Sequence, residues 1–294
     1  MLNKIGKSIY YLSNQNEKER PTLGLVCGDK YSLVIDGGNS VQHAKDFLHE
    51  IESLNVPPVK YLVITHAHWD HFLGMNEFNA AIIVNSLTNQ MINEWRSYSY
   101  DDRSLKQYVD SNKMTSQCME IIQNEIPERD SFKLNTPDIV FEGSLHIDLG
   151  NKVCLLERIR STHTDDSTIV YIPDEKVVFL GDSAYGTTTH SLFHYKQSQL
   201  LPMIKDIQKY DASHFLLGHE SICDIYEMNV FWQELISSSR AAQSASLDSA
   251  IEFFEQDNNR SPNENELFFL QAFVNDHILN QNRINRIKVD RRGC

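Results

Sequence analysis

The sequence has no apolar stretch that approaches the roughly 20 residues needed to cross a membrane, so no membrane-spanning helix is expected. Its first residues, MLNKIGKSIYYLSNQ, contain no long apolar run, and a signal peptide is therefore not expected. Positively charged residues are also few, since the chain has 27 Lys and Arg but 40 Asp and Glu, which gives a net charge of −13. Such an acidic chain predicts neither nucleic acid nor an anionic membrane as its partner.

Cysteines are few and dispersed, and none belongs to a C-x-x-C motif. An odd number of scattered thiols is typical of a reduced protein, so we expect unpaired thiols and a cytoplasmic location. The five cysteines are Cys27, Cys118, Cys154, Cys223 and Cys294. Tandem repeats and low-complexity segments are also absent from the sequence.

What the chain does contain is enough apolar material for a substantial core. Hydrophobic residues make up 41% of it, including 14 Phe and 12 Tyr. Its length of 294 residues allows one large domain or two small ones.

The segment 61–71, YLVITHAHWDH, joins a short apolar run to four potential metal ligands. Residues 61–64 are rich in β-forming side chains and follow two prolines, which is typical of a strand buried on both faces. Open α/β sheets bind their ligands just beyond the carboxyl ends of strands. His66, His68, Asp70 and His71 stand just beyond such an end.

The spacing of these four residues indicates metal binding. Alternate residues of an extended segment point the same way, so His66 and His68 can reach one ion together. Asp70 and His71 follow where the chain must turn before Gly74, and they can face a second ion nearby. Imidazole and carboxylate ligands suit zinc, and also iron, manganese or cobalt. The alternative, a polar loop with solvated histidines, is disfavoured by four ligands within six residues.

Strand and helix signals surround this motif in the order of a mixed α/β protein. Ser40 is expected to cap a helix whose residues 44, 47, 48, 51 and 54 share one apolar face. Further helices are predicted at residues 87–98, 104–125, 197–209, 230–253 and 262–280, the last with a capping box at 261–264. Strands are predicted at residues 8–12, 22–27, 31–35, 61–64, 81–84, 138–142, 144–149, 152–159, 168–172, 176–180 and 213–217.

Residues 86–135 differ from their surroundings, with few glycines and many polar residues. We interpret them as a helical insertion, which either forms a wall or lid of the site or serves packing alone. The polar side chains expected to line a substrate pocket are Tyr98, Tyr100, Tyr185, His190, His194 and Tyr195.

Three further candidate ligands, His163, Asp182 and His219, each come shortly after a predicted strand. Taken singly, such a histidine is more often a hydrogen-bonded structural residue, and Asp182 alone could cap a helix. Their placement after the first motif favours one shared site. Seven ligands can then serve two ions, with His66, His68 and His163 at the first, Asp70, His71 and His219 at the second, and Asp182 as the bridge.

This arrangement resembles that of the metallo-β-lactamase superfamily over about residues 8–222. The matching segments are DGG at 36–38, THAHWDH at 65–71, STHT at 161–164, LGD at 180–182 and LGH at 217–219. The resemblance implies an α/β (α+β) fold, a four-layer αββα sandwich with the metals at one edge between the two sheets. It also implies that Asp36 steadies a ligand histidine. We expect this domain to span residues 1–225, with a helical extension over 226–294 packed on it.

Several branches of the superfamily match less well. The antibiotic-hydrolysing branches usually lack the bridging aspartate or use a cysteine ligand, whereas this chain has Asp182 and no cysteine near a ligand position. The persulfide dioxygenases use one metal, and the flavodiiron proteins carry a glutamate at the position of His68. The nucleases share the histidine motif, but a net charge of −13 argues against nucleic acid.

The ligand set is most similar to that of glyoxalase II and the N-acyl homoserine lactonases. The resemblance implies two divalent ions, Zn²⁺ or else Fe or Mn, and a bridging hydroxide that cleaves a carboxylic ester, thioester or lactone of a small-molecule substrate. Asp70 is expected to orient that hydroxide and carry its proton. Tyr185, three residues after Asp182, is expected to donate a hydrogen bond to the substrate, as a tyrosine does in the lactonases. The alternative for Tyr185 is packing in a turn.

Three alternatives to this function stay open. The chain could be a phosphodiesterase or nuclease of the same superfamily, a redox enzyme with iron in the same ligands, or a non-catalytic metal-binding scaffold. The helical C-terminus is expected either to cover the site or to form a homodimer.

Overall fold

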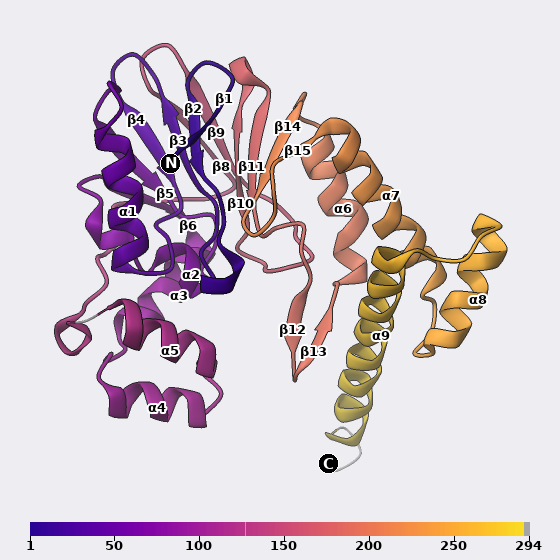
Figure 1. Cartoon of the computed structure of the whole chain (residues 1–294). Helices are drawn as coiled ribbons and strands as arrows, with labels where there is room; N and C mark the ends of the chain where they lie inside the picture. Colours follow the sequence, from indigo (N-terminus) through magenta and orange to yellow (C-terminus); the bar gives the residue numbers. More distant parts are fainter. Residues whose placement is uncertain (127, 291–294) are drawn as a thin grey trace. The chain divides into compact units, whose positions relative to one another are not determined.

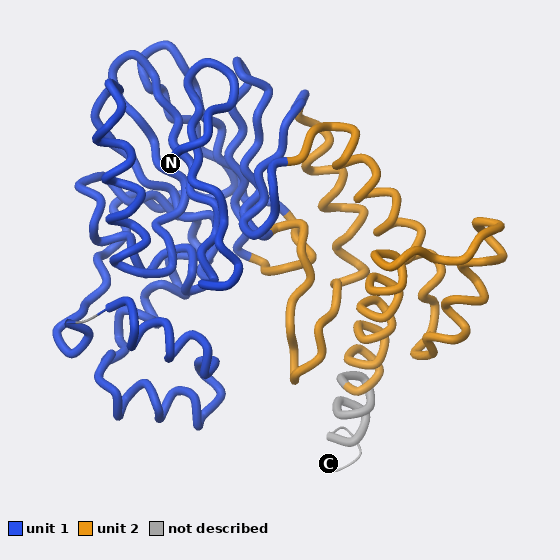
Figure 2. Tube along the Cα trace, viewed as in Figure 1, with its two compact units in different colours: residues 1–159, 166–182, 211–222 blue, residues 160–165, 183–210, 223–294 orange. Residues whose placement is uncertain are grey.

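The computed structural model describes residues 1–126 and 128–290, with side chains described up to residue 282. The chain forms two compact units, which Figure 2 shows in blue and orange. Unit 1 comprises residues 1–159, 166–182 and 211–222, and unit 2 comprises residues 160–165, 183–210 and 223 onward. The predicted division of the chain after residue 225 stays a prediction.

A seven-stranded sheet forms the first half of unit 1, with its strands in the order of the sequence. The first four strands pair antiparallel, and the pairs from β4 to β7 are parallel. The strands are β1 (Asn3–Ile5), β2 (Ile9–Leu12), β3 (Leu23–Cys27), β4 (Ser32–Ile35), β5 (Val59–Val63), β6 (Ala81–Asn85) and β7 (Ile139–Phe141). β1 is the one strand of this sheet that the sequence pattern did not indicate.

A second sheet completes unit 1. Its strands in this unit are β8 (Ser144–Asp148), β9 (Val153–Arg158), β10 (Thr168–Ile172), β11 (Val177–Gly181) and β14 (His214–Leu217). They run in the order β14-β11-β10-β9-β8, and only the β11–β14 pair is parallel. The structure thus confirms the predicted mixed α/β class.

Successive side chains of a strand point to opposite faces of the sheet, and this divides the core of unit 1 into two layers. In β4, Leu33 and Ile35 pack between the sheets, whereas Val34 packs on the outer face of the first sheet. This follows from the two-residue period of a strand. Helix α1 (Val41–Glu52) covers the outer face, as Figure 1 shows on the left. Its side chain Phe47 is buried in this layer. The helix begins where predicted, because the Ser40 side chain accepts a hydrogen bond from the His43 amide.

Among its described residues, the insertion contains three α-helices rather than the two helices that were predicted. They are α3 (Ser86–Arg96), α4 (Asp102–Asp110) and α5 (Ser116–Glu125), and they follow the short α2 (Trp69–Phe72). The predicted helix over residues 104–125 is wrong because the chain breaks at Asn112, which has a positive φ of 56°. Thr115 then caps α5 by accepting a hydrogen bond from the Cys118 amide. Whether the insertion acts as a lid stays a prediction.

Unit 2 is mainly helical. Its elements are β12 (Thr187–Thr189), β13 (Leu192–His194), α6 (Gln197–Gln208), β15 (Cys223–Asp224), α7 (Ile225–Ala241), α8 (Leu247–Asn258) and α9 (Glu264–Asp290). The predicted single helix over residues 230–253 is wrong, because Ser246 leaves the helical conformation and caps α8. The capping box before α9 also lies two residues later than predicted. Asn263 and Glu266 form it, each side chain bonding the other's backbone amide.

The described helices and cysteines agree with the expectations of no membrane span and unpaired thiols. Within the part of the chain that the structure describes, no helix is long and apolar enough to cross a membrane. Cys27, Cys118 and Cys154 are buried free thiols, and Cys223 is not in a disulfide with another described residue. Cys294 lies outside the described residues.

Phe47 has no exposed surface, and its removal should leave a cavity between α1 and the first sheet. Phe47→Ala should therefore lower the free energy of unfolding by roughly 3–5 kcal/mol, measured by chemical denaturation. Leu48→Ala, at the next and partly exposed position, is the matched control and should cost clearly less. Equal losses for the two variants would contradict this packing.

Candidate metal centre

Two parallel strands bring the first candidate residues to one edge of the seven-stranded sheet. β4 and β5 pair with Ile35 beside Val63, so the segments that follow them start side by side. Asp36 comes directly after β4, and its Oδ1 atom accepts a hydrogen bond of 2.7 Å from the Thr65 amide. Its Oδ2 atom accepts a second bond of 2.9 Å from the Thr65 hydroxyl. The carboxylate of Asp36 thereby fixes the start of the THAHWDH segment.

The same carboxylate orients His71. The Nδ1 atom of His71 lies 2.8 Å from Oδ2 of Asp36, and both side chains are buried. This is the contact expected between Asp36 and a candidate ligand histidine. It places the imidazole proton on Nδ1 and leaves the lone pair of Nε2 for a metal ion. Among the described residues, none forms a hydrogen bond to this buried Nε2 atom.

The structure brings together Asp70, His71, Asp182 and His219, all from unit 1. Their ligand atoms all lie within 4.8 Å of one another. The Oδ2 atom of Asp70 is 3.0 Å from Nε2 of His219 and 3.3 Å from Nε2 of His71. The Oδ2 atom of Asp182 is 3.4 Å from Nε2 of His71. Two imidazoles and two carboxylates at this spacing are a donor set that suits Zn²⁺.

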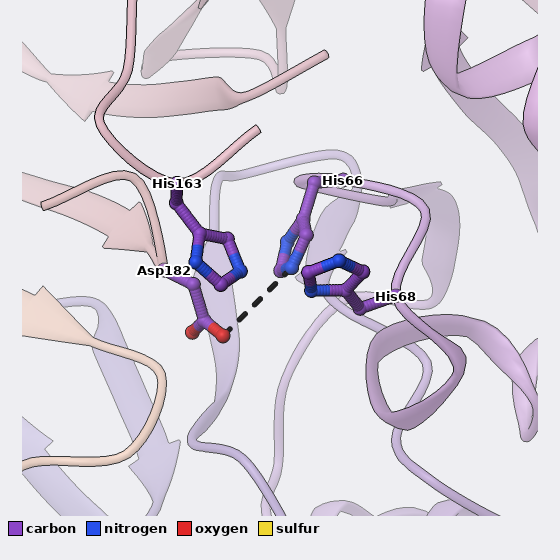
Figure 3. A group of neighbouring side chains, drawn as sticks. All are labelled: His66, His68, His163 and Asp182. Carbon is purple, nitrogen blue, oxygen red and sulfur yellow. Dashed lines mark ion pairs between the residues drawn. The ribbon is translucent and has the colours of Figure 1, made fainter. Parts of the chain in front are cut away.

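A second group consists of His66, His68, His163 and Asp182 (Figure 3). Its ligand atoms also lie within 4.8 Å of one another. The Nε2 atom of His66 is 3.8 Å from Oδ2 of Asp182, the ion pair that is dashed in Figure 3. Asp182 belongs to both groups, as a bridging ligand would. Residues 160–165, which carry His163, connect the unit 1 strands β9 and β10 along the chain.

The charges in the group of Asp70, His71, Asp182 and His219 favour bound cations. Burial alone would raise the pKa of Asp70 and Asp182, but the charges of His71 and of the neighbouring imidazoles lower the pKa of both carboxyls well below the usual range. Burial alone would also lower the pKa of His71, yet the carboxylates of Asp70, Asp182 and Asp36 raise it well above its ordinary value. A site that holds positive charge this firmly fits divalent ions as well as protons.

Gly218 allows the end of β14 to approach the centre closely. A Cβ atom at this position would lie 2.0 Å from Oδ1 of Asp182 and 3.1 Å from Cε1 of His71. Only glycine leaves room for both side chains. The LGH motif of residues 217–219 therefore needs its glycine for a steric reason.

Three residues that hold the ligand-bearing segments in place were not predicted from the sequence. The Oδ2 atom of the buried Asp166 accepts bonds from the Ala67 amide at 2.8 Å and the Thr88 hydroxyl at 2.9 Å, which ties the turn between His66 and His68 to α3. Asn14 and Asn16 donate to the backbone carbonyl of His219 at 2.8 and 3.0 Å. Asp166 could have been found from the sequence, because it lies in the HTDD segment that also contains His163. The two asparagines could not, because they lie more than 200 positions from His219 in the sequence.

Tyr185 lies in the segment that follows β11 and is half-buried. Its backbone carbonyl accepts a hydrogen bond of 2.7 Å from the Thr162 hydroxyl. The predicted contact of its phenol with substrate stays a prediction.

A comparison with protein families agrees with this geometry. The model described as the metallo-beta-lactamase superfamily matches residues 21–219, which include all seven candidate ligands. The chain belongs to the metallo-β-lactamase superfamily. The resemblance expected from the five sequence motifs is therefore confirmed, together with the fold. No curated protein matches the chain.

Solved structures of other proteins share this fold. A metallo-beta-lactamase from Pontibacter korlensis has a TM-score of 0.53 and 17% identity, over 79% of this chain and 98% of that protein. The stereoselective inverting sec-alkylsulfatase Pisa1 from Pseudomonas sp. has a TM-score of 0.60 and 12% identity. That match covers 94% of this chain but only 48% of the alkylsulfatase.

Asp36→Asn should weaken zinc binding by about 10–100-fold, because its single acceptor oxygen can serve the Thr65 amide or the His71 ring but not both. Asparagine tolerates the positive φ of 63° at this position, so the backbone need not move. Zinc affinity is measured by competition with a chromogenic chelator. Asp138→Asn is the control, since Asp138 also accepts a backbone amide bond but lies outside the two ligand groups. Equal affinities in both variants would refute the role of Asp36.

Proposed function

We propose that this protein is a dinuclear metal-dependent hydrolase that cleaves a carboxylic ester, a thioester or a lactone. The observation that carries the proposal is the pair of four-residue groups that share Asp182. His66, His68 and His163 would hold one ion, Asp70, His71 and His219 the other, and Asp182 would contact both. Members of this superfamily are mostly hydrolases, which supports a catalytic rather than a scaffold role.

Two divalent ions, in our proposal Zn²⁺, would supply Lewis acidity and lower the pKa of water at the site. Asp70 would orient the attacking water. Its Oδ2 atom faces the imidazoles of His71 and His219, so Oδ1 is the atom that we propose takes the proton. Tyr185 would donate a hydrogen bond from its hydroxyl to the substrate carbonyl or to the leaving oxygen.

The predicted partner is a small molecule, and a homodimer is the proposed assembly. The net charge of −13 disfavours a nucleic-acid substrate. The free thiols at Cys27, Cys118 and Cys154 support the proposed cytoplasmic location.

A sulfate ester is the second candidate substrate class. The likeness to the alkylsulfatase covers 94% of this chain, whereas the likeness to the metallo-beta-lactamase covers 79%. Turnover of alkyl sulfates distinguishes this class from the carboxylic esters.

The proposal is tested on protein purified without chelator. Elemental analysis should find about two zinc, iron or manganese ions per chain. A panel of carboxylic esters, thioesters, lactones, phosphodiesters and alkyl sulfates should then give turnover with one of the first three. Turnover of only phosphodiesters or sulfates would replace the proposed reaction, and turnover of none by the metal-loaded protein would favour the scaffold.

Asp70→Ala should leave about one ion per chain, because the group of Asp70, His71, Asp182 and His219 loses a carboxylate. It should also lower turnover by several orders of magnitude. Metal content and kcat are the measurements. Asp29→Ala, in the exposed turn between β3 and β4, is the control and should change neither. Two ions with near-normal activity in Asp70→Ala would exclude Asp70 from the site.

A further inference from the structure

His163 is oriented by a backbone carbonyl. Its Nδ1 atom forms a short hydrogen bond to the carbonyl oxygen of Gly186, and both residues belong to unit 2. A carbonyl can only accept, so Nδ1 carries the proton and the lone pair lies on Nε2. The Gly186 carbonyl therefore orients the ring of His163 as the Asp36 carboxylate orients that of His71.

The neighbours of His163 are held in the same way. The Ser161 hydroxyl donates to the Ser183 carbonyl at 2.8 Å, and the Thr162 hydroxyl donates to the Tyr185 carbonyl at 2.7 Å. Three successive side chains thus bind carbonyls of the segment 183–186. Ser161 and Thr162 are buried, so these bonds are shielded from water. The position of His163 consequently depends on the position of this segment.

The segment in turn packs against β13. A Cβ atom at Gly186 would lie 2.5 Å from Cζ of Phe193 and 2.7 Å from the carbonyl oxygen of His194. These distances leave no free space between Gly186 and the β12–β13 hairpin. A shift of the hairpin must therefore move the Gly186 carbonyl.

Helix α9 fixes the hairpin through two adjacent polar residues. Asn275 donates to the Phe193 carbonyl at 2.7 Å. Asp276 accepts from Nδ1 of His194 at 2.9 Å, and both of these side chains are buried. The ring of Phe193 also packs on that of Phe268, with 5.2 Å between the centroids. Polar and apolar contacts from α9 thus converge on β13.

We propose that Asn275 and Asp276 are positioning residues for the metal ligand His163, acting through the β12–β13 hairpin and the Gly186 carbonyl. This assigns the C-terminal helix a role in holding the ion at His66, His68 and His163. The inference rests on the dinuclear site of the proposed function.

The test measures zinc affinity in the Asp70→Ala background, where one ion remains to report on the group that contains His163. Asn275→Ala and Asn275→Ala/Asp276→Ala should weaken zinc binding by about tenfold or more, determined by chelator competition. Gly186→Ala should do the same, since its Cβ displaces the hairpin. His277→Ala is the matched control, because it removes an α9 hydrogen bond of 2.7 Å to the Ala242 carbonyl and leaves the hairpin bonds intact.

The expected result is weaker zinc binding in the Asn275 and Gly186 variants and unchanged binding in His277→Ala. Thermal melting of the metal-free proteins provides the second measurement. If His277→Ala lowers the melting temperature as much as Asn275→Ala but only Asn275→Ala weakens zinc binding, the positioning role is supported. Equal zinc affinity in all variants, or equal losses in Asn275→Ala and His277→Ala, would overturn the inference. Absence of zinc in the unsubstituted protein would instead refute the proposed metal centre itself.

Discussion

The carboxylate of Asp36 connects the first strands of the protein to its candidate metal centre. One oxygen accepts the Thr65 amide, and the other accepts the Thr65 hydroxyl and the His71 ring. The residue adopts a positive φ of 63°, a left-handed conformation that few residues other than glycine, asparagine and aspartate adopt, and the three bonds stabilise it. Parallel pairing of β4 and β5 makes the contact geometrically available. The side chain of Asp36 therefore links the pairing of β4 and β5 to the orientation of the ligand His71, and its bonds stabilise its own backbone conformation.

Local patterns predicted most of the fold. Apolar runs and turn residues located most strands, since burial on both faces of a sheet leaves a clear signal in the sequence. The pattern failed where a helix is interrupted without proline or glycine, as at Asn112 and before Ser246. Both interruptions depend on a side-chain cap, which a periodic apolar pattern does not reveal. The β12–β13 hairpin was also missed, because β12 consists of three polar threonines.

The candidate ligands were predictable for a different reason. Metal coordination needs particular side-chain types, and four of the seven lie within six residues. The groups that orient them are less predictable, because a backbone carbonyl such as that of Gly186 can perform the task from any residue type. Asn14 and Asn16 illustrate the same limit, since their bonds to the His219 carbonyl join distant parts of the chain. Contacts of this kind follow from the tertiary fold alone.

The sharing of Asp182 by both ligand groups has a thermodynamic consequence. In the proposed centre, an ion at either group would restrict the rotation of this carboxylate and partly prepare the other group. Repulsion between two like-charged ions acts in the opposite direction. Occupancy of the two groups is therefore linked by a coupling free energy. By reciprocity, this coupling has the same size whichever group is filled first.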